Sequence, residues 1–171
     1  MQAHNHSINL PMLVYFAAPL FSQAERHFNQ YLTEKLEGLG YQVFLPQRDG
    51  IELNQTLYNK MTKEECRSAI FQLDTTKIME SNVFLFVLDG RVPDEGACVE
   101  LGVAYTHKTL QHPNKVLIGL HTDVRSAFIG SKLNPMISVP LEYIAPTERQ
   151  LLQILEHYRN FRTIANFVEE S

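Results

Sequence analysis

Val83-Phe-Leu-Phe-Val-Leu88 is an uninterrupted apolar run rich in β-branched and aromatic residues, and the polar pair Asp89-Gly90 follows it directly. A short run of this kind is typical of a strand that is covered on both faces in a parallel sheet. It is far shorter than the ~20 residues that span a bilayer. The segment therefore predicts the central strand of an α/β fold.

Further apolar runs precede and follow this central segment, and stretches with helical spacing separate them. Ser22 and Glu25 form the pattern of a capping box, which marks the start of the first helix, and Gly40 ends it. The expected strands are 12–17, 41–45, 83–88, 115–120 and a fifth within 137–144. The expected helices are 22–39, 62–80, 97–108 and about 147–168.

Strands that alternate with helices imply right-handed crossovers and a mainly parallel, doubly wound sheet of five strands with helices on both faces. No repeat, linker or low-complexity stretch divides the chain. We expect a flexible N-terminal arm over 1–11 and a single domain over 12–171. Ligands of such sheets bind at the carboxyl ends of the strands, so the loops after Ala17, Leu45, Leu88 and Leu120 are the candidates.

The amino-acid composition and the net charge exclude some classes of protein and of binding partner. The 171 residues are 44% hydrophobic and 20% charged, which is typical of a globular protein and excludes disorder. A net charge of −4 argues against a nucleic acid polymer as partner. The first eleven residues lack the apolar core of a secretory signal, and only 2 Cys occur, so we expect a cytoplasmic protein with no membrane contact.

Two common kinds of cofactor site are not predicted. The segment from Ala17 to Phe21 contains no glycine, which argues against a dinucleotide fingerprint and a P-loop. His4 and His6 are two isolated ligands near the terminus, and the other histidines have no cysteine or acid at ligand spacing. We therefore predict no metal.

The segment that follows the central strand, Asp89 to Gly102, is the richest in candidate chemistry. Asp94 and Glu95 precede a predicted helix, where a favourable interaction with the helix dipole already explains acidic residues. Glu100 lies one turn into that helix among apolar and small neighbours, which suggests a partly buried carboxylate that serves as nucleophile or general base. The alternative is a surface acid on the outer face of the helix.

Other residues admit simpler interpretations. Asp74 lies in the second long helix, where a solvated position is the default, and Tyr15 in the first strand is by default a core residue. Cys98 is not expected to act as a nucleophile with His107, because more than about two helical turns separate them. A buried free cysteine is the preferred interpretation.

Several segments together resemble the nucleoside 2-deoxyribosyltransferases over roughly residues 12 to 140. The most specific is Pro93-Asp94-x-Gly96-x-x-x-Glu100-Leu-Gly102-x-Ala104, which is close to the signature D-x-G-x-x-x-E-x-G-x-A of that family. The segments that support it are Tyr15-Phe-Ala-Ala-Pro-Leu-Phe21-Ser22, Pro46-Gln47, Asp74 and Lys132-Leu-Asn134-Pro-Met136.

The resemblance implies a flavodoxin-like fold and a set of roles in exchanging the base of a 2′-deoxynucleoside. Glu100 would be the nucleophile, and Tyr15 would position it through a hydrogen bond. Asp74 and Gln47 would hold the base, with Asp74 or a neighbouring acid handling its proton. Asp94 would bind the deoxyribose hydroxyls. The reaction needs neither a metal nor an organic cofactor, and it matches the two-carboxylate logic of retaining glycosidases.

The resemblance also implies a homo-oligomer, based on dimers and possibly a hexamer, in which subunits share active sites. Asn134 and Met136 lie on the late loop that would reach a neighbouring subunit, where Asn134 would contact the 5′ end of the substrate. Phe21, near the first loop, and Asn134, in the late loop, favour a neutral 5′-hydroxyl on the substrate. The position before the third strand, often Asp in the family, is Asn82 in this sequence.

The expected function is therefore transfer of a 2-deoxyribosyl group, with retention, between purine or pyrimidine bases through a covalent intermediate on Glu100. The substrates would be a 2′-deoxynucleoside and a free nucleobase. Two alternatives remain open. One is an N-glycosidase that hydrolyses deoxynucleoside 5′-monophosphates, and the other is a non-catalytic nucleotide-binding domain.

Overall fold

The computed structural model describes residues 11–51, 61–123, 125 and 133–164. The N-terminal arm expected over 1–11 therefore falls outside the described residues, apart from Pro11. The same holds for residues 165–168 of the expected C-terminal helix.

The described strands form one five-stranded sheet in the order β2-β1-β3-β4-β5, and every pairing is parallel. This is the 2-1-3-4-5 order of flavodoxin-like folds, and it confirms the predicted fold class. The strands are β1 (Leu13–Ala17), β2 (Gln42–Phe44), β3 (Val83–Val87), β4 (Val116–Leu120) and β5 (Tyr143–Ala145).

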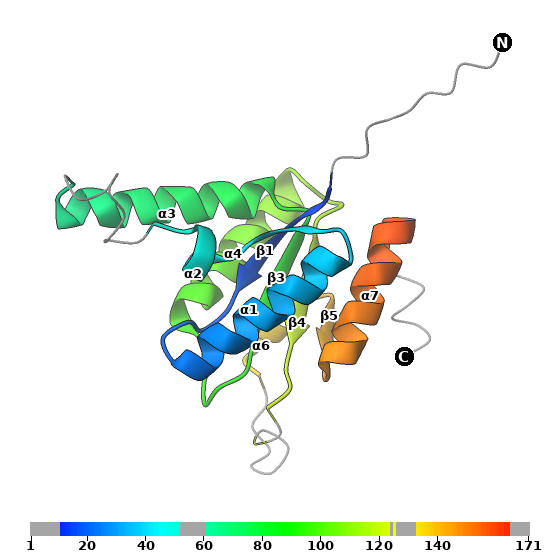
Figure 1. The fold of residues 1–171 in the computed structure, drawn as a ribbon. Helices are drawn as coiled ribbons and strands as arrows, with labels where there is room; N and C mark the ends of the chain where they lie inside the picture. The colour runs from blue at the N-terminus through cyan, green and yellow to red at the C-terminus, as the bar shows by residue number, and fades with distance from the viewer. Residues whose placement is uncertain (1–10, 52–60, 124, 126–132, 165–171) are drawn as a thin grey trace.

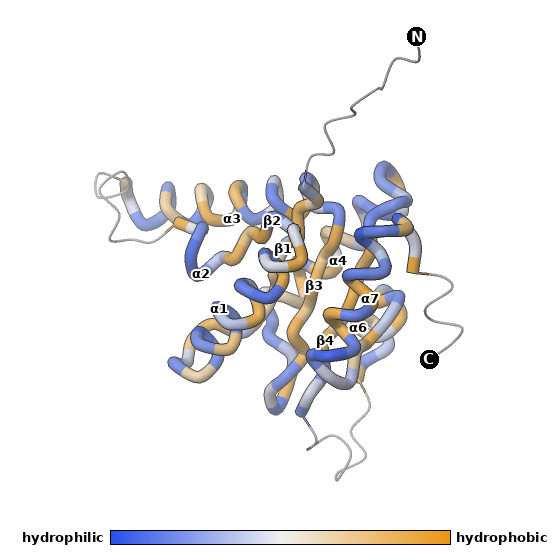
Figure 2. The backbone as a smooth tube through the Cα atoms, turned by 45° about the vertical axis from the view of Figure 1, so that its right-hand side comes forward, coloured by the Kyte–Doolittle hydropathy of each residue, from blue (hydrophilic) through white to orange (hydrophobic). Residues whose placement is uncertain are grey.

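Long helices cover both faces of the sheet (Figure 1). On one face, α1 (Gln23–Gly38) and α7 (Glu148–Phe161) contribute to a core with Val14, Phe16 and Leu85. On the other face, α3 (Lys63–Glu80) and α4 (Glu95–Leu110) pack over Tyr15, Phe84 and Phe86. Since β3 supplies residues to both cores, every one of its residues is buried, and it appears as a hydrophobic trace through the centre of Figure 2.

Side-chain caps explain where the helices begin. Ser22 and Glu25 form the predicted capping box, and Thr62 and Glu65 form a second one at the start of α3. The Asp94 side chain accepts a hydrogen bond from the Ala97 amide, so α4 begins at Glu95 and not at Ala97 as the sequence predicted. None of the helices in the described part of the chain is long and apolar enough to cross a bilayer.

The structure corrects three expected segments. Residues after β2, expected to form a loop, form the short helix α2 (Pro46–Asp49). Residues 137–144 are not one strand: Asn134 caps the short helix α6 (Pro135–Ser138), and β5 begins only at Tyr143. Proline at the first helical position and an asparagine cap favour this turn of helix over a strand.

The third correction concerns the C-terminal helix. It ends at Phe161 and not near residue 168, because Arg162 adopts a left-handed conformation with φ of 59° and its amide donates to the Tyr158 carbonyl. A residue in that conformation terminates an α-helix.

Asn82 has a structural role at the edge of the sheet opposite to the carboxyl ends. Its side-chain Oδ1 accepts a hydrogen bond from the backbone amide of Leu13 at 2.9 Å, and the backbone amide of Asn82 donates to the Leu13 carbonyl. Both contacts join β1 to the start of β3. The departure from the family pattern at this position therefore lies away from the loops in which ligands of such sheets bind.

Two glycines provide a test of the packing between the sheet and the helices α3 and α4. A Cβ at Gly119 in β4 would lie 2.9 Å from Leu88 Cδ1 and 3.1 Å from Leu141 Cδ1, whereas a Cβ at Gly102 in α4 would meet nothing within 4 Å. We expect Gly119→Ala to destabilise the fold by about 1–3 kcal/mol through overpacking. Gly102→Ala should stabilise it by about 0.5–1 kcal/mol through helix propensity. Urea unfolding measures both changes, and equal effects of the two substitutions would contradict this packing.

Candidate active site

A cavity of about 380 Å³ lies between α3 and α4. Glu100 enters it from α4, and Asp74 enters it from α3, so two consecutive helices bring two carboxyl groups to one space. The rest of the lining is mostly apolar. The other lining residues are Arg67, Ile70, Phe71, Thr75, Ile78, Gly96, Val99 and Val103.

Tyr15, in β1 of the sheet that α4 covers, contacts the Glu100 side chain. The Tyr15 ring is fully buried and stacks between Phe44 and Phe84, with centroid separations of 5.6 and 5.7 Å. Its hydroxyl donates a hydrogen bond of 2.8 Å to Glu100 Oε1. Because neighbouring strands hold the ring on both sides, the hydroxyl is a fixed donor for the carboxylate. Glu100 is therefore not the surface acid of the alternative interpretation.

Burial is the main influence on the acids of the site. Burial raises the pKa of Glu100 to about 7, the Tyr15 hydroxyl lowers it, and the charges of Asp74 and Asp94 raise it further. Burial also raises the pKa of Asp74 to about 6. The pKa of Tyr15 rises well above its usual range, first through burial and then through the charges of Glu100 and Asp74, so Tyr15 remains a proton donor. Two carboxyl groups that titrate near neutrality within one cavity are typical of acid–base and nucleophilic catalysis.

Asp94 lies at the N-terminus of α4, close enough for its charge to raise the pKa of Glu100. Its Oδ1 accepts the Ala97 amide at 2.9 Å. The helix cap alone thus accounts for an acid at this position, as the sequence suggested. The cap engages Oδ1 and also fixes the orientation of the carboxylate.

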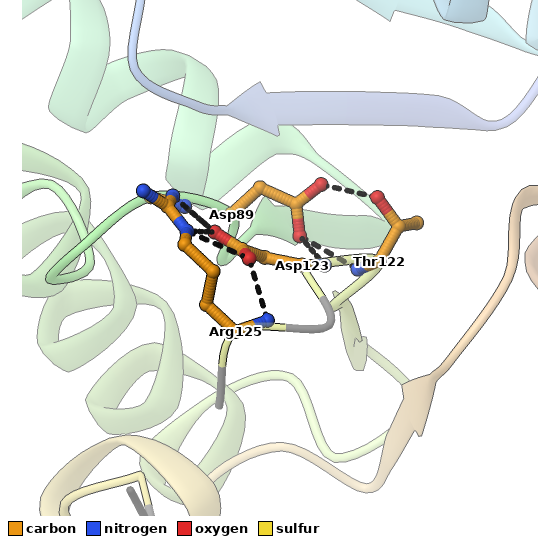
Figure 3. Close-up of polar contacts among 5 residues, drawn as sticks. Asp89, Thr122, Asp123 and Arg125 are labelled. Carbon is orange, nitrogen blue, oxygen red and sulfur yellow. Dashed lines mark hydrogen bonds and ion pairs between the residues drawn. The ribbon is translucent and has the colours of Figure 1, made fainter. Parts of the chain in front are cut away.

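The loops that follow β3 and β4 are joined by a polar cluster (Figure 3). Asp89 accepts hydrogen bonds from the amides of Thr122 and Asp123, at 2.6 and 3.0 Å, and from the Thr122 hydroxyl. Asp123 in turn forms an ion pair with Arg125. The cluster holds the start of the loop that leads to Asp94, and it places a carboxylate against the guanidinium of Arg125.

Of the eight sequence-predicted site residues, only Asp74 and Glu100 line the cavity; Tyr15 and Asp94 lie beside it, and the other four are placed as follows. The Gln47 amide is engaged with α1: its Oε1 accepts from Asn29, and its Nε2 donates to the Arg26 carbonyl. Phe21 and Met136 are each 81% exposed. Asn134 is exposed and uses its Oδ1 to cap α6.

Sequence reasoning missed Arg67 and Phe71, which line the cavity together with Asp74. Arg67, Ile70 and Phe71 precede Asp74 by seven, four and three residues, so they share one face of the helix. The apolar stripe that the sequence suggested for this helix runs through Cys66, Ile70, Leu73 and Ile78, and two of these residues, Ile70 and Ile78, line the cavity. Counting back from Asp74 in helical steps would have identified Arg67 and Phe71.

Within the described ranges, no group of three or more His, Cys, Asp or Glu side chains is arranged to hold a metal ion. The cavity instead presents a hydrogen-bonded carboxylate, a second carboxyl group and apolar walls. This arrangement suits nucleophilic attack on a carbon centre together with proton transfer to a leaving group.

Similar folds occur among solved structures. A conserved protein from Enterococcus faecalis V583 has 25% sequence identity and a TM-score of 0.64, with 84% of this chain and 96% of that chain covered. A 2-deoxyribosyltransferase from Bacillus psychrosaccharolyticus has 20% identity and a TM-score of 0.65, with coverages of 82% and 90%. The CMP N-glycosidase of Clostridium botulinum is less similar in fold, with 22% identity, a TM-score of 0.48 and coverages of 85% and 98%.

A search of curated proteins gave no match. The family model described as nucleoside 2-deoxyribosyltransferase, however, matches residues 14–139, which include β1, α3, β3, α4 and β4. The matched range contains both helices that form the cavity and the strand that carries Tyr15. On this match, and with a flavodoxin-like sheet that carries paired carboxyl groups, the chain belongs to the nucleoside 2-deoxyribosyltransferase family.

Proposed function

We propose that the protein transfers a 2-deoxyribosyl group from a 2′-deoxynucleoside to a free purine or pyrimidine base. The observation that carries the proposal is the Glu100 carboxylate, held by the Tyr15 hydroxyl in a cavity that also contains Asp74. A site that only bound nucleotides would not require a buried, oriented carboxylate. Membership of the family supports nucleoside and nucleobase substrates.

In the first step, ionised Glu100 attacks C1′ of the nucleoside. A bond forms between the carboxylate oxygen and C1′, and the bond between C1′ and the base nitrogen breaks. The electron pair of the broken bond leaves with the base, and the protonated carboxyl group of Asp74 supplies its proton. The raised pKa of Asp74, about 6, keeps a proton on this group in part of the population near neutrality.

In the second step, a nitrogen of the incoming base attacks C1′ from the side that the first base left. The ester bond to Glu100 breaks, the carboxylate is restored, and Asp74 takes the proton of the incoming base. Two inversions at C1′ give net retention. The fixed Tyr15 hydroxyl stabilises Glu100 whenever the carboxylate is charged.

Asp94 would bind the deoxyribose hydroxyls through the oxygen that does not cap α4. The charge of Arg125 is compensated by Asp123, which disfavours it as a receptor for a 5′-phosphate. This favours a nucleoside with a free 5′-hydroxyl over a nucleoside monophosphate. Asn134 and Met136 would act on a neighbouring subunit of a homo-oligomer, since both are exposed in a single chain. Phe21, near the first loop, would favour a neutral 5′-hydroxyl.

Replacing the nucleophile tests the reaction. We expect Glu100→Ala to lower the rate of base exchange between deoxyinosine and adenine by on the order of 10³-fold or more, because no other group forms the intermediate. Glu95→Ala is the matched control, since Glu95 is exposed in the first turn of the same helix. Chromatography of the products gives the rate. Deoxyadenosine formation supports transfer, whereas release of hypoxanthine with free deoxyribose only would support a hydrolase.

The pH profile tests the assignment of the two acids. Activity requires ionised Glu100 (pKa about 7) and protonated Asp74 (pKa about 6), so the rate should peak midway, near pH 6.5. Tyr15→Phe removes the hydrogen bond that lowers the pKa of Glu100, so this pKa rises. The optimum should move to higher pH with a lower maximum. An unchanged optimum, or a shift toward acid, would show that Tyr15 does not set the ionisation of Glu100.

Mixing two inactive variants tests the shared site. If Asn134 completes the site of a neighbouring subunit, oligomers assembled from Glu100→Ala and Asn134→Ala subunits contain some sites with both native residues. Such mixtures should recover part of the exchange activity that each variant lacks alone. Mixtures that co-assemble and stay inactive would place Asn134 in the site of its own subunit or outside the site.

A further inference from the structure

Arg67 lines the cavity, and the reaction described above does not use it. Along the cavity face of α3, Arg67 is followed by Ile70 and Phe71 and then by Asp74. With a rise of about 1.5 Å per residue, Arg67 and Asp74 are about 10 Å apart along the helix axis. The cavity wall thus presents a cation, an apolar surface and a carboxyl group in that order.

The guanidinium of Arg67 has no hydrogen bond or ion pair with any other residue that the structure describes. It also does not set the acidity of the two carboxyl groups: burial governs the pKa of Asp74, and burial, Tyr15 and neighbouring carboxylates govern that of Glu100. Arg67 is therefore too far from Asp74 and Glu100 to pair with them. It remains available to a ligand that extends along α3.

The open end of the cavity lies toward Arg67. Ile78, at the other end of the α3 lining, is fully buried, whereas Phe71 is 63% exposed. Figure 1 shows α3 extending well past the tip of the β1 arrow, so its N-terminal half overhangs the edge of the sheet. A bound molecule that extends beyond Asp74 can continue along this exposed part of α3.

In the proposed function, the helices α3 and α4 contact different parts of a nucleoside. Glu100 on α4 and Asp94 at its N-cap would face the sugar, whereas Asp74 on α3 would serve the nitrogen of the leaving base. A base in contact with Asp74 lies against the apolar surface of Ile70 and Phe71. Its edge remote from the sugar then faces Arg67.

We infer that Arg67 is a specificity-determining residue that selects bases with a carbonyl group on that remote edge. The preferred substrates are 6-oxopurines, such as hypoxanthine and guanine, and 4-oxopyrimidines, such as uracil and thymine. The disfavoured substrates are adenine and cytosine, which carry an amino group at the same position. This inference rests on the proposed function for the orientation of the substrate.

The chemical reason is that a guanidinium group carries only hydrogen-bond donors. It donates to a carbonyl oxygen such as O6 of a 6-oxopurine, the group that arginine reads on guanine in nucleic acids. An exocyclic amino group at that position is also a donor. Contact with it leaves both groups without an acceptor and costs binding free energy.

The experiment is an internal competition between deoxyinosine and deoxyadenosine at equal concentrations. Initial rates of release of hypoxanthine and adenine give the ratio of the two kcat/KM values. We expect the wild-type protein to favour deoxyinosine by at least about tenfold, as a specific base contact supplies. Arg67→Met should bring the ratio close to one, and Arg67→Lys should retain part of the preference because it keeps a donor. Arg149→Met, an exposed arginine on α7 across the sheet, should leave the ratio unchanged.

An unchanged ratio in Arg67→Met overturns the inference. The inference is also overturned if Arg67→Met lowers the rate with deoxyinosine 5′-monophosphate but not the rate with deoxyinosine. Arg67 would then bind a phosphate and not a base. The assay is run with and without 2-aminopurine as acceptor. Free deoxyribose as the sole sugar product in both cases would reject the transferase proposal, while the ratio would still test Arg67. Calorimetry makes the same comparison without turnover. It measures the affinities of the wild-type protein and of Arg67→Met for hypoxanthine and for adenine, and the ratio of the two affinities replaces the ratio of the rates.

Discussion

The hydrogen bond between the Tyr15 hydroxyl and the Glu100 carboxylate connects the sheet to the site. Tyr15 is fully buried between two phenylalanine rings, so its hydroxyl has no access to water and needs an acceptor. Glu100 lies in a partly buried cavity and needs a donor to remain charged. Each group satisfies the other, and loss of either partner would leave a buried polar group at a cost of about 1–3 kcal/mol. The interaction therefore links the core of the fold to the candidate site.

The parallel sheet explains why this contact forms beside Asp74. In a right-handed parallel crossover, α3 and α4 run in the same direction over one face of the sheet, and both begin at the edge where the strands end. Asp94, capping α4, and Arg67, near the start of α3, thus lie toward the same edge. In the proposed reaction, one helix would supply groups for the sugar and the other would supply groups for the base. The topology thus brings residues of both helices to one cavity.

Much of this arrangement could be predicted from local patterns. The run Val83–Leu88 predicts the central strand, because only a strand buried on both faces tolerates such a run. The capping boxes predict where α1 and α3 begin, because a cap depends on residues three apart. The same local logic failed after β4. Asn134 and Pro135 start a turn of helix there, and the apolar residues that follow suggested a strand that begins only at Tyr143.

The sequence by itself determined the order of strands and helices, the family motif and the position of Glu100 after the central strand. These depend on periodicity and on spacing within one segment. Only the tertiary structure decided that Asp74 and Glu100 share one cavity, that the Tyr15 hydroxyl donates to Glu100, that the Gln47 amide is committed to α1, and that Arg67 lines the cavity wall. The reason is physical: burial, and the pKa values near neutrality that follow from it, arise from contacts between residues as far apart as Tyr15 and Glu100. No local pattern encodes those contacts.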